Sequence, residues 1–253
     1  MLIGTTIPAM HCPRNTPSPP HPVAAFECTQ LLSGRARPVR YATASIDEQR
    51  RGISIQVAMN YRMPSLAARV LGQSKRAAQS RFNHYTQLAD LGLGRYWSRT
   101  ITLNGAQYQV AVSSRQSTDG LPLILAHTGS PLLGPLSSRS SNPYPLLRGN
   151  LYYDTRHESD ADAMFAMTAA HEIGHAFLTS AFGIHWSWGH GGTSSIFGRM
   201  AATAPPYPQS GEIALMTYYR GNPLATIYRQ DILQRTIASE NDVKTLLYIA
   251  GRE

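Results

Sequence analysis

The chain has 253 residues, 42% of them hydrophobic, which is enough to bury one sizeable core. Its 23 Lys and Arg outnumber 15 Asp and Glu, and the formal net charge of +8 favours anionic partners such as cell-envelope polymers, membrane surfaces or acidic proteins. No stretch approaches the roughly 18 uninterrupted apolar residues of a membrane helix. The N-terminus also lacks the basic start and apolar run of a signal peptide, so we expect neither a membrane span nor a cleaved signal.

The N-terminal region is rich in proline. Residues 13–22 (PRNTPSPPHP) contain five prolines and no apolar pattern, which is typical of an extended tether. We therefore predict a tether over residues 1–30 and one folded domain over residues 31–253. The spacing of Cys12 and Cys28 is compatible with a disulfide bond and equally with two reduced thiols, so the cysteines do not indicate a compartment.

A helix and several strands are expected in the first half of the domain. Apolar residues near helical spacing, without proline, predict one long helix or two short ones over residues 65 to about 91. Asn104 and Gly105 separate two β-prone runs, 101–103 and 108–112, and this pattern predicts a two-residue β-hairpin. Two further strands are expected, over residues 121–126 and 151–153.

A second helix is predicted to begin at Ser159 and to end at Gly183. Ser159 can cap it, and Asp160 and Asp162 lie in the first turn, where the helix dipole favours acidic groups. The residues between are apolar on nearly all sides, except for two histidines and Glu172. We therefore expect a buried helix that carries polar groups towards the interior.

The C-terminal third begins with a region rich in Gly, Ser and Pro, over residues 189–210, which predicts a long loop. Two more helices are expected, near residues 211–220 and 241–250. The order of elements is a helix, a small and mostly antiparallel sheet, the second helix, a loop and further helices. This order predicts an α+β fold.

The second helix contains the run His171-Glu172-Ile173-Gly174-His175. Two histidines four residues apart project from the same face of a helix, so both imidazoles can bind one zinc ion. Glu172 lies beside that face and can accept a proton from a zinc-bound water. The sequence therefore predicts a Zn²⁺ site with His171 and His175 as ligands, Glu172 as general base, and the α+β fold of a zincin-like metallopeptidase.

A catalytic zinc ion needs a third protein ligand and an open position for water. Glu212 is the first carboxylate after the motif, and it opens the helix predicted over residues 211–220. We therefore expect Glu212 to be the third ligand, as in gluzincins, where a glutamate comes from a second helix. His190 and His185 remain alternatives.

A tyrosine beside this third ligand is a candidate for a catalytic role. If Glu212 faces the zinc ion, helical spacing places Tyr219 on the same side. There Tyr219, or its neighbour Tyr218, can stabilise the oxyanion that forms when water attacks a carbonyl group. The alternative is that either tyrosine is only a packing residue.

The stretch HEIGHAFLTSAFGIHWSWGHGG, followed by YPQSGEIALMTYY, resembles the metallopeptidase-like C-terminal effector domain of some type VI secretion VgrG spike proteins. The resemblance covers most of the chain after the tether. It implies a zinc metallopeptidase toxin that is attached to a secretion spike and secreted by a type VI system. Its expected place of action is the periplasm of target bacteria, with host cells as a second target. The expected partners are a protein or peptide substrate and an immunity protein, without nucleic acid.

Two other functions remain open. The first is a cell wall amidase or endopeptidase that uses the same zinc ion, since a basic surface suits an anionic wall. The second is a binding module with a structural zinc ion, whose basic helix near Lys75, Arg76 and Arg81 docks on an acidic partner. The binding module differs from the two enzymes at the site, because a structural zinc ion has no open position for water.

Overall fold

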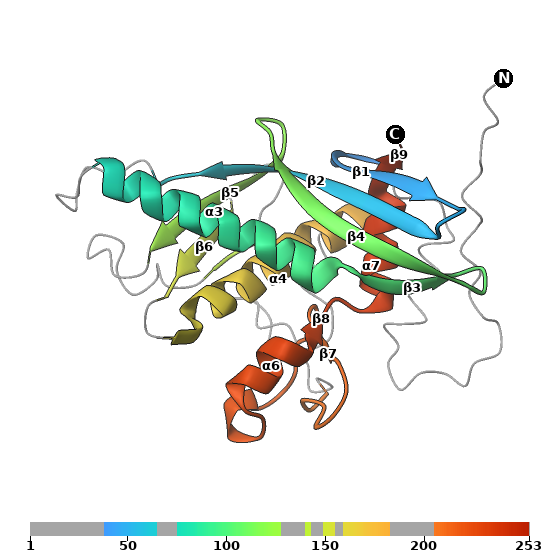
Figure 1. Ribbon diagram of the computed structural model, residues 1–253. Helices are drawn as coiled ribbons and strands as arrows, with labels where there is room; N and C mark the ends of the chain where they lie inside the picture. Colours follow the sequence, from blue (N-terminus) through green and yellow to red (C-terminus); the bar gives the residue numbers. More distant parts are fainter. Residues whose placement is uncertain are drawn as a thin grey trace.

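The computed structural model describes residues 38–64, 75–127, 140–142, 149–154, 159–182 and 205–252. In these residues a curled mixed sheet packs against helices, which confirms the predicted α+β class (Figure 1). Several predicted features lie outside the described residues: the tether over residues 1–30, the two cysteines, the histidines at 185 and 190, and residues 189–204 of the predicted loop.

Seven strands form the main sheet. Its hydrogen-bonded order is β3-β4-β2-β1-β9, while β5 pairs with β2 and β6 pairs with β5. The strands are β1 (Val39–Asp47), β2 (Gly52–Arg62), β3 (Arg99–Leu103), β4 (Ala106–Gln116), β5 (Leu121–His127), β6 (Gly149–Tyr153) and β9 (Ala250–Arg252). A separate pair consists of β7 (Ile213–Ala214) and β8 (Thr236–Ile237).

The expectation of a small, mostly antiparallel sheet is wrong. Within the described strands of the main sheet, β1–β2 and β3–β4 are antiparallel, whereas β1–β9, β2–β4, β2–β5 and β5–β6 are parallel. The β3–β4 hairpin was predictable because Asn104 and Gly105 both have positive φ, 50° and 79°, as a tight turn of this kind requires. Parallel neighbours are joined by long crossovers, which leave no local signal in the sequence.

The described helices are α3 (Lys75–Trp97), α4 (Ala161–Phe182), α6 (Arg229–Arg235) and α7 (Glu240–Ile249), with a short 3-10 helix η3 (Pro223–Ala225). The motif helix is confirmed as α4, and the last predicted helix as α7. The first predicted helix is confirmed over its described part, which is α3. This helix continues beyond the predicted end, to Trp97. None of the helices in the described ranges is both long and apolar enough to cross a membrane.

The prediction of a helix over residues 211–220 is wrong, and α6 was not predicted. The segment forms β7 and then an irregular path, with Gly211 and Gly221 at positive φ of 74° and 96°. Its backbone pairs with β8 instead of with itself, so a long-range contact overrides the local helical pattern. In Figure 1, β7, β8 and α6 lie below α3 and α4, apart from the seven-stranded sheet.

The motif helix α4 is held by direct contact with α3. Trp97, at the end of α3, is fully buried and donates a hydrogen bond from Nε1 to the carbonyl oxygen of Ala170 at 3.1 Å. Its ring also meets Phe177 edge to face, with centroids 4.8 Å apart. The two helices cross at Gly92, where an added Cβ atom would collide with the backbone of Ala166. This close crossing fixes the position of α4 relative to the core.

We expect Gly92→Ala to lower the free energy of unfolding by about 1–3 kcal/mol, because the new methyl group has to push α4 away from α3. Gly94→Ala is the matched control, since a Cβ there would lie 3.4 Å from the nearest atom, a carbonyl oxygen of Val112. That substitution removes a helical glycine and should be neutral or stabilising by up to about 1 kcal/mol. Chemical denaturation measures both, and equal stabilities of the two variants would contradict the close crossing.

Candidate metal centre

The side chains of His171 and His175 converge, as the motif predicts. Their Nε2 atoms are 3.2 Å apart, and the two rings are perpendicular with centroids 4.8 Å apart. The hydroxyl oxygen of Tyr218 lies 3.0 Å from Nε2 of His171 and 2.9 Å from Nε2 of His175. Three side chains from two distant parts of the chain therefore meet at one point, while α4 buries its apolar residues around them.

The ring of His171 is held in one orientation by a backbone group. Its Nδ1–H donates a hydrogen bond to the carbonyl oxygen of Leu215 at 2.7 Å. A carbonyl oxygen can only accept, so the proton of the neutral ring lies on Nδ1 and Nε2 presents a lone pair. Burial lowers the pKa of His171, and the bond to Leu215 opposes this shift only in part. The imidazole is therefore neutral at pH 7, as a metal ligand must be.

The histidine pair fits a zinc ion. Two nitrogen ligands of a tetrahedral zinc ion, each about 2.05 Å from the metal, lie about 3.3 Å apart. The observed 3.2 Å between the Nε2 atoms of His171 and His175 agrees with that separation. The hydrogen bond from the second ring nitrogen to a carbonyl is also typical of metal-binding histidines. Glu172 follows His171 on α4 and is half-buried.

The segment that carries Leu215 and Tyr218 is anchored through its backbone. β7 pairs with β8, and the N–H of Leu215 donates to the carbonyl oxygen of Ile237 at 2.9 Å. Arg235 donates to the carbonyl oxygens of Gly211 and Pro208, at 2.7 and 2.6 Å. These bonds fix the path of the segment, although the segment itself is not helical.

The same segment packs on the motif through Gly174. Met216 is buried, and a Cβ atom added at Gly174 would come within 2.5 Å of its sulfur and of the Trp97 ring. Only glycine allows this approach at that position of α4. The motif therefore carries both histidines and the glycine against which the Tyr218 segment packs.

The structure does not bring Glu212 to the histidine pair. Its carboxylate accepts two hydrogen bonds from Arg99, at 3.0 and 3.3 Å, and its side chain is 61% exposed. Arg99 also donates to the carbonyl oxygen of Ala238 at 2.8 Å. Within the described parts of the chain, no group of three or more His, Cys, Asp or Glu side chains is arranged to hold a metal ion. The expectation relied on a helix over residues 211–220, and the structure has β7 and an irregular path there instead.

Tyr218, the alternative to Tyr219, is the tyrosine that reaches the histidines. The hydroxyl oxygen of Tyr219 instead accepts the backbone N–H of Ala214 at 3.0 Å, and its ring stacks on Tyr207 with centroids 4.6 Å apart. Along the irregular backbone the two neighbouring hydroxyls therefore have different partners. The sequence could identify the tyrosine pair but not which member faces the motif.

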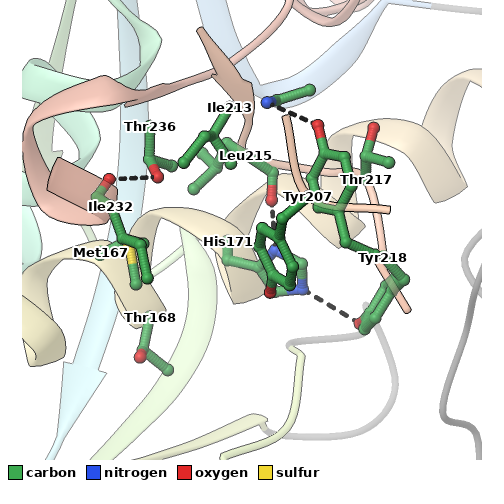
Figure 2. Close-up of a pocket in the computed structure, with 12 residues that line it drawn as sticks. Met167, Thr168, His171, Tyr207, Ile213, Leu215, Thr217, Tyr218, Ile232 and Thr236 are labelled. Atoms are coloured by element: carbon green, nitrogen blue, oxygen red, sulfur yellow. Dashed lines mark hydrogen bonds between the residues drawn. The ribbon is translucent and has the colours of Figure 1, made fainter. Parts of the chain in front are cut away.

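An open cavity of about 240 Å³ adjoins His171, between α4 and the C-terminal segment (Figure 2). Apolar and hydroxyl-bearing side chains line it, without any Asp, Glu, Lys or Arg among the described lining residues. They are Met167, Thr168, His171, Tyr207, Ile213, Ala214, Leu215, Thr217, Tyr218, Tyr219, Ile232 and Thr236. The sequence did not indicate this cavity, because its two walls are far apart along the chain.

No protein-family model, curated protein or solved structure matches the chain. The chemistry of the site therefore has to be inferred from its own geometry. Fold and site together define an α+β protein in which a histidine pair and a tyrosine hydroxyl converge beside an open, uncharged cavity.

Replacement of Glu212 by Ala should leave zinc affinity nearly unchanged, because the carboxylate pairs with Arg99 and not with the imidazoles. The free energy of unfolding should fall by about 1 kcal/mol at most, since the carboxylate is largely exposed. Titration with zinc against a competing chelator measures the affinity, with His175→Ala as the comparison. A loss of about a hundredfold or more in Glu212→Ala, similar to that of His175→Ala, would make Glu212 a ligand after all.

Proposed function

We propose that the protein is a zinc-dependent metallopeptidase with a zincin-like fold. The observation that carries this proposal is the convergence of the His171 and His175 Nε2 atoms, 3.2 Å apart, on one face of a buried helix. The separation of the two Nε2 atoms is that of two ligands on one tetrahedral zinc ion, and the Tyr218 hydroxyl lies beside both. The run HExxH adds the carboxylate that such hydrolysis requires.

His171 and His175 would hold the zinc ion through their Nε2 atoms. A zinc ion bound there supplies a Lewis acid and lowers the pKa of a bound water to about 7. The carbonyl oxygen of Leu215 keeps the His171 ring in the orientation and protonation state that binding requires. Of the expected third ligands, Glu212 pairs with Arg99, while His185 and His190 lie outside the described residues.

Glu172 acts as the general base. It follows His171 directly on α4, and its half-buried carboxylate is the acidic group of the motif. Its Oε atom takes the proton from the attacking water and then gives it to the nitrogen of the leaving amine. One carboxylate thereby serves both halves of the hydrolysis.

Tyr218 stabilises the developing oxyanion. Its hydroxyl is held 3.0 and 2.9 Å from the two imidazole nitrogens, so it is in place before the substrate binds. From there its O–H donates to the carbonyl oxygen of the substrate as that oxygen becomes negative. This assignment replaces Tyr219, whose hydroxyl is engaged by Ala214.

The proposed biological role is that of a toxin delivered by a type VI secretion spike. It rests on the resemblance of the motif region and of the segment at residues 207–219 to spike-borne effector domains. The proposed place of action is the periplasm of target bacteria, with host cells as a second target and an immunity protein as partner.

A cell wall amidase or endopeptidase is the second candidate. The net charge of +8 favours it, because a basic protein is attracted to an anionic wall. Incubation with purified sacculi separates the two candidates, since a wall enzyme releases muropeptides and a protein-directed peptidase does not.

Glu172→Ala should lower peptide hydrolysis by about a hundredfold to ten thousandfold, because the proton acceptor is removed. About one zinc ion per chain should remain, since both predicted histidine ligands are intact. Hydrolysis is measured with peptide substrates and zinc by elemental analysis, and His171→Ala is the control that should lose both. A folded Glu172→Ala protein with full activity would exclude the mechanism.

Tyr218→Phe should lower kcat by about a hundredfold to a thousandfold while KM changes little, because the hydroxyl acts on the transition state. Tyr228→Phe serves as the control, since the Tyr228 side chain is 84% exposed and its removal should leave kcat unchanged. Steady-state kinetics on one peptide substrate measures both variants. Equal kcat values in the two variants would remove Tyr218 from the mechanism.

A further inference from the structure

The cavity beside His171 is large enough for a bulky side chain. Its volume is about 240 Å³, and it is partly open to solvent. A cavity of about 150 Å³ lined by apolar side chains holds a benzene molecule, so the ring of a phenylalanine or the branch of a leucine fits here with room to spare. One wall is α4, through Met167, Thr168 and His171, so the cavity adjoins one of the two histidines of the proposed site.

The walls of the cavity are mainly apolar. Ile213, Leu215 and Ile232 are buried side chains that contribute to them, together with Met167. A flat aromatic wall comes from Tyr207, which stacks on Tyr219 at 4.6 Å between centroids.

Some of the polar groups of the walls are already engaged within the protein. The hydroxyl of Tyr219 accepts from the backbone of Ala214 at 3.0 Å. The hydroxyl of Thr236 donates to the carbonyl oxygen of Ile232 at 2.6 Å. Both hydroxyls form hydrogen bonds within the protein, so fewer polar groups remain in the cavity to bind a ligand.

The described walls of the cavity offer no ionic partner to a charged side chain. No Asp, Glu, Lys or Arg lies among its described lining residues. A charged side chain that entered would lose its hydration without gaining an ionic partner, which is strongly unfavourable. An apolar side chain gains free energy in proportion to the surface that it removes from water.

We infer that this cavity is the specificity pocket of the enzyme and that it binds a large apolar side chain, such as Phe, Leu or Met, of the peptide substrate. This inference rests on the proposed peptidase function, since the peptide is held at the histidine pair. The pocket sets which residue flanks the cleaved bond, since it is lined by His171, which would hold the zinc ion, and by Tyr218, which acts on the substrate carbonyl. The recognised ligand class is therefore a peptide with a bulky uncharged residue next to the scissile bond.

A degenerate peptide library tests the preference. The zinc-loaded full chain is incubated with peptides that carry all amino acids at each position, and mass spectrometry identifies the new ends. We expect Phe, Leu or Met to be favoured over Lys and Asp by about tenfold or more at one position beside the cut. In Thr168→Asp, which places a carboxylate in the pocket, this preference should fall about tenfold and Lys should gain.

Thr226→Asp is the matched control, because Thr226 is exposed and does not line the cavity. It should keep the preference of the unsubstituted protein. Thr168→Phe is a second variant that fills the pocket without adding charge, and it should shift the preference towards Ala. If Thr168→Asp does not fold, the Thr168→Phe result decides.

Binding without catalysis provides an independent measurement. N-acetyl-phenylalaninamide and N-acetyl-lysinamide are titrated into the Glu172→Gln protein, and NMR chemical shifts report saturation. The phenylalanine probe should bind measurably and the lysine probe about tenfold more weakly or not at all. Thr168→Asp in the same background should abolish this difference, whereas Thr226→Asp should not.

The outcomes separate the pocket from the proposed function. Binding of the phenylalanine probe that depends on Thr168, without cleavage of any peptide, would support the pocket and overturn the peptidase proposal. Cleavage without an apolar preference, or probe binding that is the same in Thr168→Asp and Thr226→Asp, would overturn the pocket and leave the peptidase proposal standing.

Discussion

The contact between the motif helix and the segment after β7 is the constraint on which the site depends. Gly174 has no side chain, so Met216 and Trp97 reach the backbone of α4 at that point. With Met216 packed there, the carbonyl oxygen of Leu215 meets His171 and the hydroxyl of Tyr218 reaches both imidazoles. If that packing distance increased, the hydrogen bonds that orient the site would be lost together.

The contact also links the site to the core. Trp97 ends α3, bonds to the carbonyl of Ala170 and packs on Phe177, so the position of the motif helix is set by the largest fully buried side chain among the described residues. On the other side, Arg99 joins Glu212 to the carbonyl of Ala238 and so fastens the C-terminal segment to β3. The site thus lies where the motif helix of the core meets the segment that follows β7.

Local sequence patterns predicted the elements that depend on local contacts. The turn at Asn104 and Gly105 identified its hairpin, and the apolar run around His171 identified α4. Strands β1 and β2 were not predicted, and the parallel pairings were missed because their partners are distant along the chain. The helix expected around Glu212 was wrong for the same reason, since β8 pairs with that segment.

The sequence by itself determined the histidine pair, because a four-residue spacing on a helix places two side chains on one face whatever surrounds them. It also determined the neighbouring carboxylate of Glu172 and the α+β class. Only the tertiary structure decided that Tyr218, and not Tyr219 or Glu212, meets the imidazoles, and that an uncharged cavity adjoins them. The physical reason is that these groups lie about forty residues from the motif, and the path of a non-helical segment depends on its long-range partners.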